Sequence, residues 1–323
     1  MKKFLFTVIF CTLFLFNAFA QSEEADEIST QSEETDEITE QPETANEIIE
    51  QSETEGITIS AEYQLSSLNF STKGINSGSI LTWRDIYLNG AYVNVNFPGA
   101  LFGYQRTNIS AGFSGSFSGY WTDDDSNNDL DVIFTAAAET YLLEFNYEIF
   151  SVDHGPNFEL SHKLGLDFIT LFFNNYDATA YTPNTDNTYY EWEGLTNKFD
   201  HYTLAFYGSV QAVYGTGVFY TAISGQAGIG ISLSFADWIY RRDLKHPVSF
   251  SYFGISFRGE SNFEIGFRFK RGFTLFTKAL LMYEISPGLG LITFYGNNNN
   301  IGAGGMLMEL SRASLNVGIK ISF

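Results

Sequence analysis

Apolar and polar residues alternate along most of this chain. In "NFEIGFRFK", residues 262–270, every second residue is apolar: Phe263, Ile265, Phe267 and Phe269. The same period of two runs through "LNVGIKISF" to the last residue, Phe323. A period of two belongs to a β-strand whose two faces meet different surroundings. The pattern therefore predicts an all-β protein made of two-faced strands.

Turn residues divide this alternation into ten predicted strands. The strands lie near 57–70, 79–97, 105–121, 130–150, 158–180, 201–223, 228–241, 248–269, 272–286 and 301–323. The connections alternate between short ones, such as "DHGP", "GQAG" and "KRG", and longer polar ones, such as "TDDDSNNDL" and "RRDLKHP". Short turns at one end and long loops at the other are typical of an outer-membrane β-barrel. An even strand number places both termini at the turn end, in the periplasm.

The position of the charged residues favours a barrel over a secreted soluble β-sandwich. In "EFNYEIF", Glu144 and Glu148 share one face, and Phe145 and Ile149 share the other. A sandwich would bury its apolar face between two sheets. A membrane barrel turns that face to lipid and its polar face to the lumen. We therefore expect an antiparallel ten-stranded transmembrane β-barrel over residues 57–323.

The ends and lengths of the strands add two expectations. A lipid-embedded sheet has no open edge, so the last strand must pair with the first. Several predicted strands exceed the roughly 9–11 residues that cross a bilayer. We therefore expect the barrel to project beyond the membrane and to carry a rim there.

Composition agrees with an exported barrel. Aromatic residues make up 17% of the chain, whereas charged residues make up 17%, below the roughly 25% of a soluble domain. Residues 1–20 combine a basic start, an apolar core and a small-residue end, which predicts a signal peptide cleaved after Ala20. Cys11, the single cysteine, lies inside it, so the mature chain is expected to have no thiol chemistry. No later apolar run reaches the roughly 18 residues of a spanning helix.

An acidic segment follows the predicted signal peptide. Residues 21–56 repeat with a period of ten and contain fourteen acidic and no basic residues. Such a sequence repels itself and cannot bury a core, so it is predicted to be a disordered tail. It is either a solvated spacer or a segment that contacts a basic periplasmic partner.

Candidate chemistry lies on two of the long loops. One loop carries Asp123 and Asp125, and the other carries Asp243 and His246. In a ten-stranded barrel these loops follow strands four positions apart, so the two groups can face each other across the mouth. His246 could then act as a general base on a water molecule, with Asp243 orienting its ring. The two Asp residues opposite would hold that water.

Strand number, loop lengths and these residues resemble the omptin family of outer-membrane proteases. The likeness covers most of residues 57–323 and includes "SILTWRDIYLNGAYVNVNF", "GIGISLSFADWIYRRDLKH" and "NNNNIGAGGMLMELSRASLNVGIKISF". It implies a surface endopeptidase that cleaves next to basic residues, with Asp123 and Asp125 as the Asp pair and Asp243 and His246 as the dyad. It also implies contact with outer-membrane lipid and dependence on an outer-leaflet glycolipid, with no other cofactor.

One spacing departs from the family and leaves a second function open. The family dyad is Asp-x-His, whereas Asp243 and His246 are three residues apart. In a regular strand this spacing puts the two side chains on opposite faces unless a bulge intervenes. The alternative is a non-catalytic barrel, either a narrow pore or an adhesin. His201, near the start of a predicted strand, is a rival for chemistry at the rim. The acidic, exported chain excludes a nucleic-acid partner.

Overall fold

The computed structural model describes residues 56–75, 80–102, 104–124, 133–155, 157–181, 190–239, 248–269, 272–294 and 300–323. These residues form eleven β-strand segments in one antiparallel sheet. The segments are β1 (Thr58–Gly74), β2 (Ile80–Leu101), β3 (Tyr104–Ser116), β4 (Tyr120–Asp124), β5 (Ile133–Gly155), β6 (Phe158–Tyr181), β7 (Tyr190–Thr216), β8 (Phe219–Trp238), β9 (Val248–Phe269), β10 (Phe273–Phe294) and β11 (Asn300–Ser322). Among the residues described, no helix is long and apolar enough to cross a membrane.

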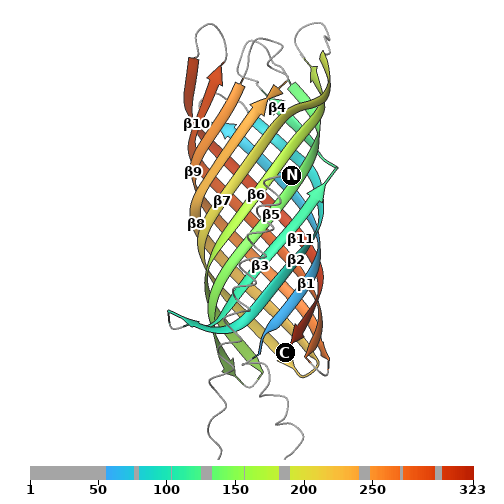
Figure 1. Cartoon of the computed structure of the whole chain (residues 1–323), viewed down its shortest axis with the longest axis vertical. Helices are drawn as coiled ribbons and strands as arrows, with labels where there is room; N and C mark the ends of the chain where they lie inside the picture. Colours follow the sequence, from blue (N-terminus) through green and yellow to red (C-terminus); the bar gives the residue numbers. More distant parts are fainter. Residues whose placement is uncertain are drawn as a thin grey trace, which may run out of the picture. The chain divides into compact units, whose positions relative to one another are not determined.

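The sheet closes on itself and forms a barrel (Figure 1). β1 pairs with β2 on one side and with β11 on the other, and the β1–β11 register is unbroken from Thr58↔Ser322 to Gly74↔Met306. β3 and β4 both lie between β2 and β5, so the eleven segments fill ten positions around the ring. This confirms the predicted ten-stranded barrel and the pairing of its first and last strands.

A bulge divides the third position of the ring into β3 and β4. The hydroxyl of Ser116 accepts a hydrogen bond from the Ser118 amide at 3.0 Å, which holds the chain out of the ladder. Gly119 then returns it to the sheet with φ of 116°. A Cβ at this glycine would lie 2.7 Å from Cγ1 of Ile86, so both the backbone angle and the space require glycine.

The connections differ from the prediction at two long loops and one turn. β7 begins at Tyr190 rather than near 201, and β10 runs on to Phe294 rather than ending near 286. "GQAG", residues 225–228, was expected to join two strands, but it lies inside β8. The turn is instead at residues 217–218, where Gly217 adopts φ of 69°. The pairs Thr216↔Phe219 and Gly225↔Ser261 show why: Gly225 pairs regularly with β9 and needs no special backbone angle. Gly225 therefore indicates a stretch of small side chains on the outer face of β8, and not a turn.

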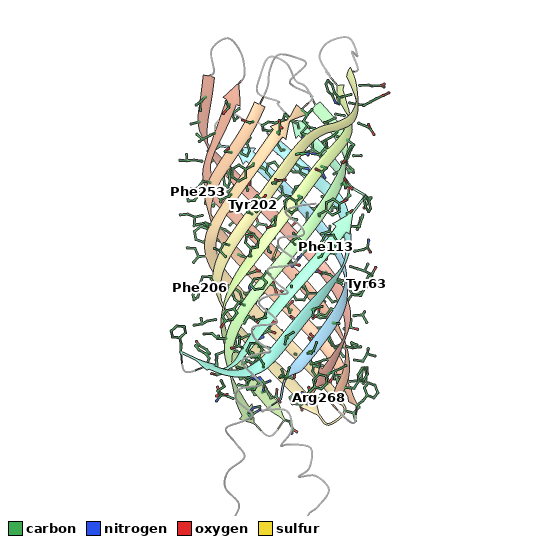
Figure 2. The ribbon with its side chains drawn as sticks, viewed as in Figure 1. Tyr63, Phe113, Tyr202, Phe206, Phe253 and Arg268 are labelled. Carbon is green, nitrogen blue, oxygen red and sulfur yellow. The ribbon has the colours of Figure 1, made fainter. Side chains whose placement is uncertain are left out.

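Large apolar side chains cover a broad band on the outside of the barrel. Phe253, Phe206 and Tyr63 are each 54% exposed on the outer surface (Figure 2). Phe263 and Phe269 of the alternating stretch in β9 are also half-exposed. Their polar neighbours face the lumen, where Glu264 accepts a hydrogen bond from Tyr220 at 2.5 Å. An apolar outside around a polar inside is the arrangement of a barrel in lipid.

Inside the lumen, tyrosine rings lie over glycines of the neighbouring strand. A Cβ at Gly165 would lie 2.4 Å from Cζ of Tyr207, and one at Gly266 would lie 2.3 Å from Cε1 of Tyr220. The missing side chain therefore leaves the space that each ring occupies. These rings narrow the lumen while their hydroxyls bind charged groups, as the 2.8 Å bond from Tyr207 to Glu148 shows.

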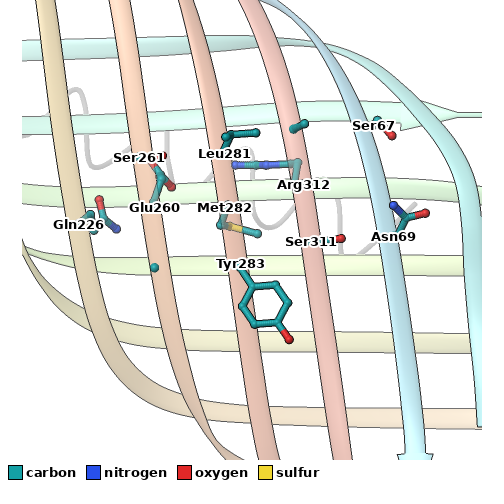
Figure 3. Close-up of a pocket in the computed structure, with 12 residues that line it drawn as sticks. Ser67, Asn69, Gln226, Glu260, Ser261, Leu281, Met282, Tyr283, Ser311 and Arg312 are labelled. Atoms are coloured by element: carbon teal, nitrogen blue, oxygen red, sulfur yellow. The ribbon is translucent and has the colours of Figure 1, made fainter.

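Towards the loop end, the two faces of the wall exchange character. On β9, Phe253, Ile255 and Phe257 face outward and Arg258 inward, but nearer the loops Phe250 and Tyr252 are buried inside. On β11, Leu315 and Val317 face outward, whereas Met308 and Leu310 are buried inside. The ladders of β11 with β1 and β10 and of β8 with β7 and β9 show no register shift, so the surroundings change and the pairing does not. Figure 3 shows the strands at this level and a pocket with a volume of about 540 Å³, which is lined by Glu260, Tyr283 and Arg312 among others.

The loop-end part of the barrel therefore has a hydrophobic core of its own. We call this part the cap. Its core consists of residues from nearly every strand, among them Leu68, Phe70, Trp83, Trp121, Phe173, Phe199, Trp238 and Phe250. The expectation that polar groups line the whole interior is thus wrong for the cap. Where the outer surface meets water, the sheet must bury its apolar face inside.

Candidate functional site at the loop end

Asp123 lies on the inner face of the cap. It is in β4, where it pairs with Leu81 of β2 and Phe134 of β5. Its side chain is buried, with 2% exposed, and it shares the inner face with Trp121, which lies two residues earlier. Asp123 is thus held at the rim of the barrel by strand pairing rather than by a free loop.

The other predicted site residues, Asp125, Asp243 and His246, lie outside the described residues. The strands that lead to them are in place: β4 ends at Asp124 and β8 ends at Trp238. β5, β6 and β7 separate these two strands on the ring, so the loops leave the barrel four positions apart. This matches the predicted strand order, whereas the positions of the two loops and the grouping of the four side chains stay predictions.

An aromatic layer fills the barrel below the rim. The ring of Trp83 lies 4.9 Å from that of Phe173 and 4.7 Å from that of Phe199, between ring centroids. Phe70 packs against Phe173 at 5.5 Å. Each of these four side chains is at most 1% exposed. We call them the aromatic layer; they close the interior across its width, since they come from β1, β2, β6 and β7.

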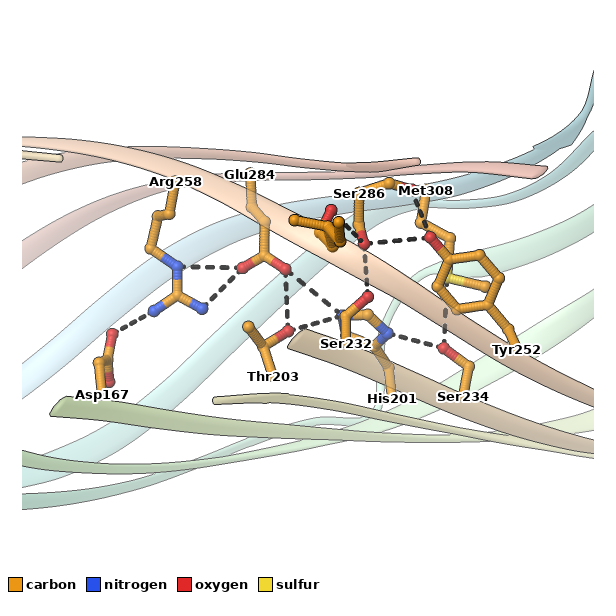
Figure 4. Close-up of polar contacts among 11 residues, drawn as sticks. Asp167, His201, Thr203, Ser232, Ser234, Tyr252, Arg258, Glu284, Ser286 and Met308 are labelled. Atoms are coloured by element: carbon orange, nitrogen blue, oxygen red, sulfur yellow. Dashed lines mark hydrogen bonds and ion pairs between the residues drawn. The ribbon is translucent and has the colours of Figure 1, made fainter. Parts of the chain in front are cut away.

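His201 lies at the lower edge of this layer and is part of a buried polar network (Figure 4). Its Nδ1 is 2.8 Å from the hydroxyl of Ser234, and its Nε2 is 3.1 Å from the hydroxyl of Thr203. Thr203 donates to Oε1 of Glu284 at 2.8 Å, while His201 itself is 3.8 Å from that oxygen. Sequence reasoning singled out His201 but placed it at an open rim; it is 1% exposed.

Arg258 extends the network across the lumen. Its Nε and Nη2 donate to Oε2 of Glu284 at 3.0 and 2.6 Å, and its Nη1 binds Asp167 of β6. The guanidinium thus joins β6 to β9 and β10. A buried Arg between two carboxylates satisfies all three charged groups by paired hydrogen bonds.

Ser234, His201 and Glu284 are arranged like a nucleophile, a base and an orienting acid, with Thr203 between the last two. A substrate, however, has no access to the Ser234 hydroxyl. Ser234 is fully buried, and its hydroxyl lies 3.2 Å from Sδ of Met308. No substrate can reach an oxygen enclosed by the cap core, since a nucleophile must contact the reacting atom. The network therefore positions strands beneath the cap and is not a second active site. Among the described residues, no group of His, Cys, Asp and Glu could hold a metal ion.

Hydrogen-bonded polar pairs lie on the outer surface of the cap. Tyr120 of β4 donates a hydrogen bond to Asp85 of β2 at 2.6 Å, and Thr82 and Thr122 bond across the same strand pair at 3.0 Å. The bond to Asp85 raises the pKa of Tyr120, because ionising the phenol would break it and set two negative charges side by side. These contacts hold the short strand β4, and with it Asp123, against β2.

A closed antiparallel ring, an apolar band outside a polar lumen and long connections at one end define an outer-membrane β-barrel. The apolar band places this protein in the outer membrane. The cap stands beyond the band at the loop end.

Comparison with solved structures finds the same fold. The outer membrane protease OmpT of Escherichia coli superposes with a TM-score of 0.66 at 12% identity, over 84% of this chain and 98% of that chain. The translocator domain of the autotransporter NalP from Neisseria meningitidis covers 95% of this chain and 96% of its own, with a TM-score of 0.42 and 10% identity. No protein-family model matches the chain, and no curated protein matches it in sequence.

Proposed function

We propose that this protein is a surface endopeptidase whose site lies at the mouth of the cap. Asp123 and Asp125 hold a water molecule, His246 accepts its proton, and Asp243 orients the imidazole. The observation that carries this proposal is the position of Asp123: an aspartate held on the inner face of the rim. The loop that bears His246 leaves the barrel four positions away.

The proposed substrate is a peptide with basic residues. Three consecutive aspartates, Asp123 to Asp125, would give the proposed site a concentration of negative charge on one side. Peptide lysine or arginine next to the cleaved bond would pair with such carboxylates. The likeness of the fold to OmpT, described as an outer membrane protease, supports the reaction class. We also propose that the folded enzyme needs an outer-leaflet glycolipid around the lipid-facing band.

Purified, folded protein in lipid, with and without glycolipid, should cleave members of a fluorogenic peptide library that carry a basic residue. Asp123→Asn and His246→Ala should each lower kcat/KM by about 10²–10⁴-fold, the usual contribution of a general acid or base. Glu309→Gln, on the outer surface of β11, is the control and should retain activity. Cleavage by His246→Ala at the rate of the unaltered protein would rule out this site.

A non-catalytic surface barrel is the second candidate, and two observations favour it. Asp123 is only 2% exposed, which limits its access to a substrate. Asp243 and His246 are three residues apart, so a regular strand would separate their side chains. Under this candidate the folded protein cleaves no library member, with or without glycolipid, and the site variants fold and behave like the unaltered chain. The aromatic layer opposes the pore form of this candidate.

A further inference from the structure

The lumen below the aromatic layer retains contact with water. Ser224 and Gln226 of β8 and Glu260 and Asn262 of β9 point inward and are only partly buried. Lys320 of β11, near the turn end, keeps about a third of its side chain exposed, although it pairs with Glu264 at 3.7 Å. Along β9 the partial exposure runs from Arg268 near the turn end to Glu260 and ends below the cap.

Buried polar atoms in the same region also require water. The side-chain oxygens of Asn146, Asn262 and Asn316 have no hydrogen-bond partner within the described part of the protein. These residues come from β5, β9 and β11, so the unfilled positions are spread around the lumen. An amide oxygen buried without a partner costs free energy, and internal water normally supplies the missing bond.

The next level towards the loops is closely packed. Its inward side chains include Leu68, Leu171 and Leu310, each at most 2% exposed, with the aromatic layer directly above them. An apolar constriction of this kind excludes water and ions by dewetting. The network of His201, Glu284 and Arg258 lies at this boundary with its hydrogen bonds made internally.

We propose that the lumen is a blind aqueous vestibule. It opens at the turn end, admits water and small hydrophilic solutes as far as the level of Glu260, and is sealed by the leucines and the aromatic layer. The protein therefore does not conduct ions across the membrane, although part of its interior is wet. This property is independent of peptide hydrolysis at the opposite end.

Two serines on one strand allow a matched test. Ser224 and Ser232 share the inner face of β8; the first is partly buried and the second is fully buried below the cap. Cysteine is nearly isosteric with serine, and Cys11→Ser removes the single natural thiol. Each single-cysteine variant, folded in detergent micelles so that both ends meet water, is treated with a small charged methanethiosulfonate and labelling is measured by mass spectrometry.

We expect full labelling of Ser224→Cys and none of Ser232→Cys until the protein is unfolded. The unaltered protein should give no conductance steps in a planar bilayer. Labelling of both cysteines, or conductance by the unaltered chain, would show a continuous channel; labelling of neither would show a dry lumen. Either result overturns the proposal. Heat-dependent migration on a gel confirms that each variant is folded, and a lost peptidase activity would leave these outcomes unchanged.

Discussion

At the scale of single residues, the charged groups of the lumen are paired between strands rather than along one strand. Arg258 binds Glu284 and Asp167, Lys278 lies 2.8 Å from Glu62, and Arg312 lies 2.7 Å from Glu144. Most of these side chains are buried, so each charge depends on its partner. Removing one partner from such a pair leaves an uncompensated buried charge.

Glu284→Ala is therefore expected to lower the free energy of unfolding by about 3–5 kcal/mol, because Arg258 loses a carboxylate in a buried site. Urea unfolding in lipid vesicles, followed by tryptophan fluorescence, measures this change. The control is Glu309→Ala, which removes the outer-surface acceptor of Tyr283 and should cost less than about 1 kcal/mol. Equal effects of the two substitutions would contradict a stabilising role for the lumen network.

The sequence reveals which residues share a face but not what each one binds. Glu144 and Glu148 were predicted to face the lumen, and both do. Asp123 was predicted to lie on a loop and instead ends up inside a short strand. Because β4 forms only after the bulge at Ser116–Gly119, alternation alone could not place Asp123 on the inner wall. The positions of Asp125, Asp243 and His246 remain predictions.

At the scale of elements, the bulge between β3 and β4 sets the geometry of the rim. It shifts the third position of the ring by one residue against β5, from Ser116↔Thr140 below the bulge to Tyr120↔Ala137 above it. Without it, the residues that precede the first long acidic loop would point to other faces. Gly119 is the residue that this change of register requires.

Gly119→Ala should destabilise the barrel by more than the strain of a positive φ, which is about 1 kcal/mol, because its Cβ would also collide with Ile86. Gly194→Ala is the matched control: Gly194 has φ of 84°, but a Cβ there meets nothing within 4 Å. The folded fraction after refolding into lipid, read from gel migration, should fall more for Gly119→Ala. A larger loss for Gly194→Ala would contradict the assigned role of the bulge.

Strand number was predictable, since turn residues interrupt the alternation at most real turns, but the start of β7 and the end of β10 were not, because polar and glycine residues continue into these strands. The exception was "GQAG", where small residues on the outer face of β8 imitate a turn. Composition cannot distinguish the two cases, because glycine serves both a turn and a flat strand surface.

At the scale of the whole barrel, the same strands are exposed to lipid over one part of their length and to water over the other. Near the turns, lipid lies outside and the apolar residues face it. In the cap, water lies outside and the apolar residues form a core. The sequence does show this change, because the apolar residues of β9 switch from even to odd positions. Phe250 and Tyr252 occupy even positions, whereas the apolar residues from Phe253 to Phe257 occupy odd ones. Reading the alternation as one uniform pattern hid this change, so the cap core was not predicted.

The four tryptophans of the chain allow this division to be measured directly. Trp83, Trp121 and Trp238 belong to the cap core, and Trp192 packs against it. In vesicles of lipids brominated along their acyl chains, tryptophan fluorescence of the unaltered protein should be blue-shifted but essentially unquenched, since these rings lie inside the barrel and beyond the bilayer. Phe257→Trp, in the lipid-facing band, should add a quenched component. Strong quenching of the unaltered protein would place its tryptophans against lipid and would contradict the cap.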